Sequence, residues 1–410
     1  MTIDFVPYHV PSIGQAEIDA VVGVLRSGWL TTGPQVRALE AAFAQSVGAA
    51  HAVAVNSCTA ALHLALESAG VGPGDEVLVP TITFAATAEV VVHLGARPVL
   101  VDCQRDTYTI DPEAAAAAVT PRTRAIVPVH FAGQACDMDE ILRLARARTL
   151  TVVEDAAHAL PSAYRGTPIG RIGDMTCFSF YATKTLTTGE GGMVTTEDAA
   201  AADRMRIMSL HGISRDAWKR YSSEGTWRYD IEYAGFKYNM TDLAAALGLV
   251  QLARQREFLE ARRRIAEQYT AAFAPLAEVR CPAVRPDREH AWHLYVIEID
   301  VDRLDLSRDE FIEALKREGI GTSVHFIPLH LHPYYRRTFG YRPGDFPNAL
   351  AAFERIVSLP VYPAMTEEAV ARVVDAVRRT VHRGRRPLAA VRHVPARSAP
   401  GLPEPGIAGA

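Results

Sequence analysis

Short apolar runs alternate with segments of helical period over the first half of the chain. Leu62, Ala65, Leu66 and Ala69 recur at i, i+3, i+4 and i+7, and Gly70 follows them, which predicts a helix that ends at the glycine. Strands separated by helices predict a mostly parallel sheet covered on both faces. The expected buried strands are AVAV (52–55), EVLVP (76–80), PVLVD (98–102), AIVPV (125–129), TVVED (151–155), CFSF (177–180) and GGMVTT (191–196).

The second half of the chain predicts a long helical segment and then a smaller unit of mixed structure. Thr241 and Asp242 open a stretch of helical period, which predicts one long helix or two. The expected elements are this helical stretch (240–275), a strand (290–300), a capped amphipathic helix (307–319) and a further strand (322–326).

These patterns predict an α/β protein with two domains. We expect a large domain with its N-terminal segment over residues 1–255 and a small C-terminal α+β domain over 256–383. The tail, residues 384–410, is rich in Pro, Ala, Gly and Arg and is expected to be disordered. The segment 211–234 is too long for a plain connector, which suggests a lid or a subunit contact.

Composition excludes several classes of protein. The 410 residues carry a net charge of −4 with no dominant basic stripe, which gives no support to a nucleic-acid partner. No apolar run approaches the ~18 residues that span a bilayer, and the first residues lack the pattern of a secretion signal. Five scattered cysteines, none in a CxxC pair, indicate a reducing cytoplasm without a disulfide framework or a zinc site.

Lysine is rare in this chain, which limits any chemistry that needs a primary amine. The 43 basic residues include only Lys184, Lys219, Lys237 and Lys316. Lys316 lies on a polar helix face and Lys219 in a charged loop, so neither is expected to be sheltered. Lys184 follows the strand CFSF and precedes a glycine-rich turn at the mouth of the sheet. Desolvation there would lower the pKa of the amine and make it a usable nucleophile and base.

Two other strand ends carry polar residues that suit one cofactor. Asn56-Ser57-Cys58-Thr59 lies between a strand and a helix, where it is either a simple helix cap or a cradle for an anion. Glu154 and Asp155 end a buried strand, and His158 follows. A carboxylate at this position either caps the next helix or acts as an anion that keeps a pyridine nitrogen protonated, as pyridoxal phosphate requires.

The three strand ends converge on one hypothesis, because such sheets bind ligands beyond the carboxyl ends of their strands. Ser57, Thr59 and backbone N–H groups, including that of Cys58, would cradle a phosphate, and Ser179 could add a hydroxyl. Phe84, after another strand, offers an apolar face to a ring. The sequence thus predicts a site for pyridoxal 5′-phosphate.

Several motifs, taken in order, resemble the DegT/DnrJ/EryC1/StrS family of sugar aminotransferases. The resemblance covers nearly residues 5 to 380 and implies the fold-type I, aspartate-aminotransferase-like architecture with a seven-stranded, mostly parallel sheet. Within the family the chain is most similar to nucleotide-sugar 4-aminotransferases of the UDP-4-amino-4-deoxy-L-arabinose–oxoglutarate type. The motifs are NSCTAALHLAL, PTITFAATAEVV, VDCQRDTYTIDPE, EDAAHA, FSFYATKTLTTGEGG, GFKYNMTDLAAALGLVQL, HAWHL and SRDEFIEALKREGIGTSVHF.

The resemblance implies roles for individual residues. Lys184 would form the internal aldimine, Asp155 would contact the pyridine nitrogen and His158 would lie near the phenolic oxygen. It also implies a homodimer with shared active sites, in which Lys237 or Asn239 reaches the partner's cofactor phosphate. The phosphate of the same subunit would be held by Ser57, Thr59 and Ser179.

These inferences predict a cytoplasmic transaminase that moves an amino group from an amino acid, expected to be L-glutamate, to the C4 keto group of a nucleotide-linked sugar. Thr31, His325 and His330 are the candidate substrate contacts, and no metal is expected. The alternatives are a cyclitol or 3-keto-sugar aminotransferase, a regulator that binds the cofactor without turnover, and a nucleotide-binding module without the cofactor.

Overall fold

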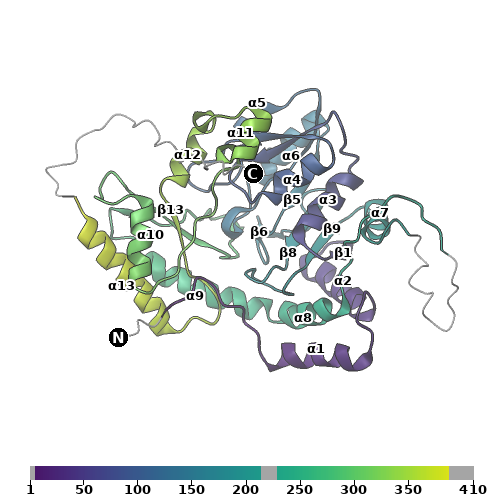
Figure 1. Cartoon of the computed structure of the whole chain (residues 1–410), viewed down its shortest axis with the longest axis horizontal. Helices are drawn as coiled ribbons and strands as arrows, with labels where there is room; N and C mark the ends of the chain where they lie inside the picture. The colour runs from purple at the N-terminus through teal and green to yellow at the C-terminus, as the bar shows by residue number, and fades with distance from the viewer. Residues whose placement is uncertain (1–4, 214–228, 387–410) are drawn as a thin grey trace, which may run out of the picture.

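The computed structural model of the chain describes residues 5–213 and 229–386. Its centre is a seven-stranded sheet with the order β1-β9-β8-β5-β4-β2-β3 (Figure 1). The strands from β3 to β8 form a parallel run, and β9 pairs antiparallel with both β8 and β1. The predicted mostly parallel sheet is therefore confirmed. Its strands are β1 His51–Val55, β2 Glu76–Pro80, β3 Arg97–Val101, β4 Thr123–Ile126, β5 Thr151–Asp155, β8 Met175–Ser179 and β9 Gly192–Thr196.

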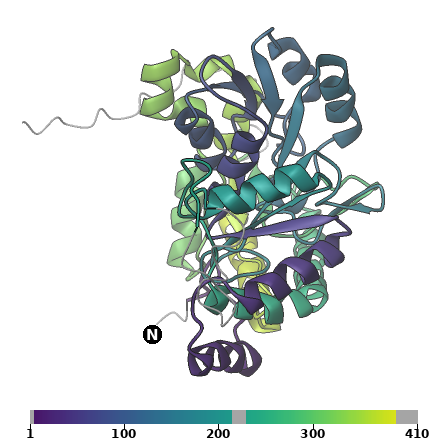
Figure 2. The ribbon, with the colours of Figure 1, turned by 90° about the vertical axis from the view of Figure 1, so that its right-hand side faces the viewer.

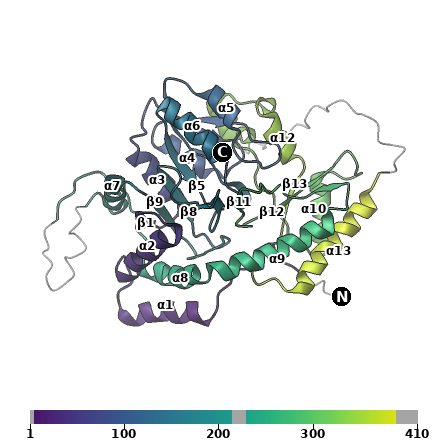
Figure 3. The same cartoon turned by 180° about the vertical axis from the view of Figure 1, so that it is seen from behind.

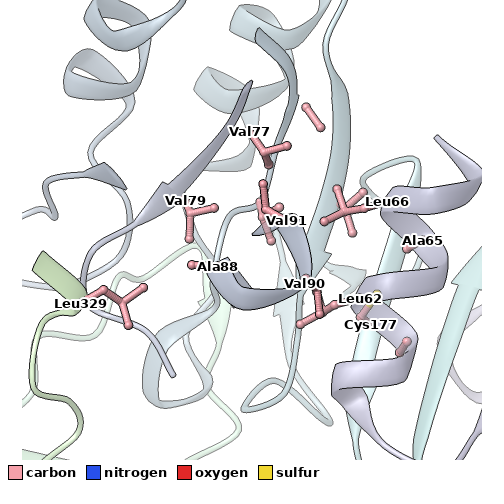
Figure 4. Close-up of a cluster of buried hydrophobic side chains, with 14 of the residues drawn as sticks. Leu62, Ala65, Leu66, Val77, Val79, Ala88, Val90, Val91, Cys177 and Leu329 are labelled. Atoms are coloured by element: carbon pink, nitrogen blue, oxygen red, sulfur yellow. The ribbon is translucent and has the colours of Figure 1, made fainter. Parts of the chain in front are cut away.

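Helices cover both faces of this sheet because alternate residues of each strand face opposite sides. Val77 and Val79 of β2 pack in one apolar cluster with α3, α4 and α7, as Figure 4 shows for α3 and α4. Leu78 packs in a second cluster with α2, α5, α6 and α8 on the other face. The helices are α2 Pro34–Val47, α3 Cys58–Ser68, α4 Ala86–His93, α5 Pro112–Ala118, α6 Met138–Arg148, α7 Ala199–Ser209 and α8 Asp242–Ala253.

The predicted helix after residue 57 is α3, and Gly70 follows its end with φ +74°. The helical segment opened by Thr241 forms two helices, because Arg254 separates α8 from α9. Helix α1 (Gln15–Ser27) packs on α8 and lies at one extremity of the molecule (Figure 2).

A third apolar cluster lies in the C-terminal part, around the antiparallel sheet β10-β12-β13. Helix α9 leads from α8 to this part and packs against α13 (Figure 3). Val6 also belongs to this cluster, and its backbone hydrogen-bonds to Gly319 and Gly321. The elements are α9 Gln255–Phe273, β10 Val279–Arg280, β12 Tyr295–Ile299, α10 Arg308–Arg317, β13 Ile356–Leu359 and α13 Glu367–Gly384.

The remaining short elements border the two parts. Helices α11 and α12 contribute Tyr335 and Ala349 to the first cluster of the large sheet. A small three-stranded sheet has the order β11-β6-β7. The elements are β6 Ala163–Tyr164, β7 Thr167–Pro168, β11 Arg288–Glu289, α11 Pro333–Phe339 and α12 Pro347–Phe353.

Two expectations for the C-terminal part need correction. The strand expected at 290–300 is shorter, since only β12 is extended there, and the capped helix at 307–319 is α10. The strand expected at 322–326 is wrong: Ser323 makes a single bridge with Ser358, and the chain then leaves the sheet. Its apolar residues instead turn toward the large domain, where Val324 and Phe326 pack on the first cluster.

Some expectations are not tested by this structure. Most of the segment 211–234 and nearly all of the tail 384–410 lie outside the described residues. The division of the chain at residue 255 stays a prediction. Among the described helices, none has the length and apolar character that crossing a membrane requires.

Candidate active site

Four strand ends meet at one edge of the large sheet. Val55 and Ser179, the last residues of β1 and β8, both pair with Gly192, the first residue of the antiparallel β9. Asp155, the last residue of β5, pairs with Cys177 of β8. The sheet topology thus brings together the three segments in which the sequence placed the phosphate cradle, the carboxylate and the lysine.

The turn between β1 and α3 is both a helix cap and an open cradle. Ser57 Oγ accepts a hydrogen bond of 3.1 Å from the Ala60 N–H and so caps α3. The first N–H groups of a helix have no intrahelical acceptor and favour an anion. A Cβ on Gly192 would lie 2.6 Å from the carbonyl carbon and oxygen of Ser57 and 2.8 Å from the Cys58 nitrogen. Only a glycine at position 192 therefore allows β9 to pack directly against the backbone of the turn between β1 and α3.

Lys184 lies in the turn after β8, and its N–H donates to the Tyr181 carbonyl at 2.9 Å. The residue is half-buried. Burial lowers the pKa of its amine from 10.5 to about 8, against the opposing influence of the neighbouring Cys58 and Asp155. A much larger fraction of this amine is uncharged at neutral pH than of an exposed lysine, which suits a nucleophile and proton carrier.

The two adjacent carboxylates of β5 have different environments. Glu154 accepts hydrogen bonds from His130 Nε2 at 2.8 Å, Gly173 N–H at 2.7 Å and Thr176 Oγ1 at 2.7 Å. Burial opposes ionisation, but these donors lower the pKa of Glu154 overall. All three donors belong to the fold itself, so Glu154 is a satisfied structural anion and Asp155 is the carboxylate left for a ligand.

Asp155 is buried at the strand end. Its Oδ2 accepts from Thr87 Oγ1 at 2.8 Å and its Oδ1 accepts from the Ala157 N–H at 3.1 Å. Burial raises the pKa of Asp155, and the hydrogen bonds and the nearby Lys184 offset only part of that effect. A cation placed against this carboxylate would compensate its burial.

Aromatic rings from the C-terminal part of the chain lie close to His158. Its ring centroid lies 4.4 Å from that of His293 and 5.8 Å from that of Phe326, which is stacked on it. Phe84 is 64% exposed, and its ring centroid lies 6.1 Å from that of Phe326. Burial, with the charge of Lys184, holds the pKa of His158 well below its ordinary value, so the ring is neutral.

His325 joins this group of rings, and its role as a substrate contact stays a prediction. Its ring stacks on Tyr8 with centroids 5.7 Å apart, and its Nδ1 lies 2.8 Å from Ser358 Oγ. Burial and the charge of Lys184 lower the pKa of His325 to about 4.

Sequence reasoning missed several residues of the site. Burial is the main cause that lowers the pKa of His9 to about 4, and the charges of Arg262 and Lys184 lower it further. The buried His9 Nε2 and His293 Nδ1 have no hydrogen-bond partner among the described residues, so each can serve a ligand. His293 stands in the HAWHL motif that carried the resemblance, a signal that could have suggested it. His9 precedes every periodic element, and no pattern marks it.

Arg262 of α9 is another buried neighbour of His9 and His293 that the sequence did not reveal. It is 1% exposed, and its Nη1 donates to the carbonyls of Trp292, His293 and Val361 at 3.3, 3.4 and 2.5 Å. Within residues 5–213 and 229–386 no carboxylate pairs with it. Burial lowers the pKa of Arg262 to about 10. The guanidinium holds the backbone of His293, whose ring lies against that of His158.

The other predicted contacts lie elsewhere in this chain. His330 is fully buried, and its two ring nitrogens lie 2.8 Å from Thr81 Oγ1 and 3.2 Å from the Pro343 carbonyl. It thus fastens the loop that carries His325 to the turn after β2. Its role as a substrate contact stays a prediction.

The Asn239 segment lies against the end of β1. Asn239 Nδ2 donates to Thr32 Oγ1 at 2.7 Å, and the backbone carbonyl of the exposed Thr31 accepts from the Asp242 N–H at 3.2 Å. Lys237 is exposed, and its carbonyl accepts from Asn56 Nδ2 at 3.3 Å. Asn239 thus contacts the residue next to Thr31, and the roles of Thr31, Lys237 and Asn239 stay predictions.

The model of the DegT/DnrJ/EryC1/StrS aminotransferase family matches residues 11–378. The chain belongs to this family. Spore coat polysaccharide biosynthesis protein SpsC of Bacillus subtilis is 54% identical over 375 residues, which is 91% of this chain and 96% of SpsC.

Solved structures agree with this membership in the DegT/DnrJ/EryC1/StrS family. Spr1654 of Streptococcus pneumoniae, described as a sugar aminotransferase, has a TM-score of 0.86 and 36% identity to this chain. The match covers 92% of this chain, together with 98% of Spr1654 in its PMP form and 99% of Spr1654 in its PLP form. DesV of S. venezuelae has a TM-score of 0.81 and 37% identity, over 88% of this chain and 93% of that one. The fold-type I architecture is thereby established, and the chain is a pyridoxal-phosphate-dependent sugar aminotransferase.

The residues of this family member fit its cofactor, pyridoxal 5′-phosphate. The α3 N-terminus with Ser57 suits the phosphate, and the close approach allowed by Gly192 keeps this cradle free of a side chain. Asp155 is a buried carboxylate that gains from a cationic ring nitrogen, and Lys184 is a sheltered amine. The individual assignments of these residues remain predictions.

Proposed function

We propose that the chain transfers an amino group from an amino acid, L-glutamate in the simplest case, to the C4 keto group of a nucleotide-linked sugar. The family membership supports an aminotransferase that acts on sugars. The relative SpsC, by its name, belongs to polysaccharide biosynthesis, a process built on activated sugars. The UDP-4-amino-4-deoxy-L-arabinose type, which the sequence resembles, is the first candidate.

One observation carries the proposal: a sheltered amine at the mouth of a sheet that also offers a carboxylate and an anion cradle. Lys184 has a pKa near 8 because burial disfavours its charged form. General acid–base catalysis is most effective when the pKa of the group lies near the working pH. Lys184 can therefore both accept and return a proton at its Nζ under ordinary conditions.

The other residues hold and shield the reacting groups. When bound, the cofactor supplies an electron sink for the carbon that loses its proton. Asp155 stabilises positive charge at the ring nitrogen, and Ser57, Cys58, Thr59 and Ser179 bind the phosphate. In two half-reactions the amino acid gives up its amino group and leaves as a keto acid, and the keto sugar then receives that group.

The wall of rings bounds the space next to Lys184. His158 is neutral and lies in contact with His293 and Phe326, and it is expected near the phenolic oxygen of the cofactor. The exposed ring of Phe84 is available to stack on the cofactor ring. Such a wall excludes water from the lysine, which keeps its amine desolvated.

Recognition of the acceptor sugar is assigned to the small-domain side and to a second subunit. His325 stands beside the ring wall, and His330 fastens its loop to the sheet. We infer a homodimer in which either Lys237 or Asn239 reaches the partner's cofactor phosphate, because this segment lies beside the end of β1, where the Lys237 carbonyl accepts from Asn56 Nδ2. Thr31 is assigned to the sugar pocket. A cytoplasmic location completes the proposal and rests on the sequence alone.

Purified protein loaded with pyridoxal 5′-phosphate should transfer the amino group of glutamate to a 4-keto nucleotide sugar. The amino sugar product is detected by its mass. The 3-keto nucleotide sugars and keto-inositols test the two competing substrate classes in the same screen. Lys184→Ala should abolish turnover and the fixing of the cofactor by borohydride, while Lys316→Ala, an exposed lysine, should change neither.

Particular outcomes would contradict the proposal. Turnover of Lys184→Ala at the parent rate would refute the role of the lysine. Activity only with keto-inositols or 3-keto sugars would show that the acceptor is not a 4-keto nucleotide sugar. Binding of the cofactor without any turnover would favour a regulatory protein that binds the cofactor but does not catalyse.

A further inference from the structure

A pair of buried threonines lies behind Asp155. Thr83 is 2% exposed and stands in the turn after β2, and Thr87 is 1% exposed and stands in the first turn of α4. Thr87 Oγ1 donates to Asp155 Oδ2 at 2.8 Å, and Thr83 Oγ1 lies 2.7 Å from Thr87 Oγ1. The three side chains form one continuous hydrogen-bonded chain that ends on the carboxylate.

The direction of this chain depends on the charge of Asp155. An ionised carboxylate only accepts hydrogen bonds, and each hydroxyl has a single proton. The Thr87 proton must therefore point to Asp155, and the Thr83 proton must then point to Thr87. Hydrogen bonds aligned in this way polarise and strengthen one another, and they favour the ionised acceptor.

We propose that Thr83 and Thr87 are positioning residues that keep Asp155 ionised and fix its orientation toward the ring nitrogen of the cofactor. The proposal rests on the role of Asp155 in the proposed function. The two oxygens of Asp155 are held from different elements, Oδ2 by the threonine of α4 and Oδ1 by the Ala157 N–H. The plane of the carboxylate is thus fixed, and each oxygen keeps a lone pair for a further donor.

The surroundings of Asp155 show why such donors matter. The titratable groups that interact with it are Lys184, His130, Cys58 and Cys177. Burial raises the pKa of Asp155, and the hydrogen bond from the α4 threonine is the foremost of the interactions that lower it, ahead of the charges of Lys184 and His130. The charge of Lys184 does not keep Asp155 ionised at every pH, because about half of that amine is uncharged at pH 8.

A conservative substitution series tests the proposal. Thr87→Val keeps the shape of the side chain and removes the hydroxyl, Thr87→Ser restores it, and Thr83→Val breaks the chain one bond farther away. Thr109→Val is the matched control, since Thr109 is also 1% exposed and its Oγ1 lies 2.8 Å from that of Thr107, outside the hydrogen-bonded chain that reaches Asp155. Asp155→Asn removes the charge itself.

Three properties should be measured for each variant: affinity for pyridoxal 5′-phosphate by absorbance titration, the pH dependence of the bound chromophore's spectrum, and the unfolding midpoint. A hydrogen bond to a charged group is worth roughly 1.5–3 kcal/mol, which is about tenfold to hundredfold in an equilibrium constant. Thr87→Val should weaken cofactor affinity by about that factor and move the Asp155-dependent spectral transition to higher pH by one unit or more. Thr83→Val should give a smaller shift in the same direction, and Thr87→Ser should restore the parent values.

The outcomes separate this inference from the proposed function. If Asp155→Asn alters affinity and spectrum but Thr87→Val and Thr83→Val behave like Thr109→Val, losing only stability, the positioning role is overturned. If Asp155→Asn leaves both properties unchanged, the role of Asp155 and the inference fall together. If the threonine series behaves as expected while no keto sugar is aminated, the inference stands and the proposed substrate falls. Should Thr87→Val not fold, Thr83→Val carries the test alone.

Discussion

Gly192→Ala should separate the phosphate cradle from the sheet that supports it. The new Cβ would lie 2.6 Å from the carbonyl carbon and oxygen of Ser57, whereas ordinary contacts begin near 3.4 Å, so the backbones must part by about 0.8 Å (3.4 − 2.6). The obstructing atoms are backbone, and Gly192 is paired on both sides, with Val55 and Ser179. Overpacking of this kind costs about 1–3 kcal/mol of stability.

The same displacement should weaken binding of the cofactor phosphate. The N–H groups of the α3 N-terminus must be aimed at the anion, and a shift approaching 1 Å can cost on the order of a hundredfold in a site that depends on positioning. Urea unfolding of the cofactor-free protein would measure the loss of stability, and fluorescence titration with pyridoxal 5′-phosphate would measure the affinity.

Gly72→Ala is the matched control, because a Cβ at this position would meet no atom within 4 Å and the φ of Gly72 is not positive. It should leave stability and affinity close to those of the parent. If Gly192→Ala binds the cofactor as tightly as Gly72→Ala does, the close approach of β9 does not build the cradle, and the reasoning is refuted.

Two further predictions concern the small-domain side of the site. Arg262→Ala should cost about 3 kcal/mol or more in urea unfolding, because it leaves three buried carbonyls without their donor, whereas Arg263→Ala, an exposed neighbour, should cost less than about 1 kcal/mol. Equal losses for the two would contradict this account. Unfolding free energy should also fall as the pH drops from 6.5 toward 4, because His9 and His325, with pKa values of about 4, stay neutral in the folded state while the unfolded state takes up protons. The two histidines together contribute at most about 2.7 kcal/mol per pH unit to this slope. If a His325→Asn variant shows the same acid slope as the parent, His325 does not contribute to it.

Much of the fold, and the meeting of the candidate site segments at one edge of the sheet, could be predicted from local pattern. The apolar runs gave all seven strands of the large sheet because a strand buried on both faces has a continuous apolar sequence, which is visible without tertiary information. The carboxyl ends of such strands mark the ligand site, so Ser57, Asp155 and Lys184 could be found from their positions after strands. The scarcity of lysine then singled out Lys184.

Local pattern failed where distant segments decide the environment. The segment 322–326 has strand-like apolar residues, yet Ser323 alone pairs with Ser358, and the Phe326 ring stacks on that of His158, 168 positions away in sequence. The partner of His330 was equally invisible in the sequence, because its Nδ1 lies 2.8 Å from Thr81 Oγ1, 249 positions away.

The sequence by itself therefore determined the sheet, the helices that cover it and the order of the chemical groups at its edge, because each of these follows from periodicity within a short window. Only the tertiary structure revealed how differently the two adjacent carboxylates are held, since Glu154 is bound by the remote His130 and Thr176, whereas Asp155 accepts from Thr87 and the Ala157 N–H. Only the tertiary structure set the acidity of Lys184, because its desolvation comes from side chains that reach it from other parts of the chain.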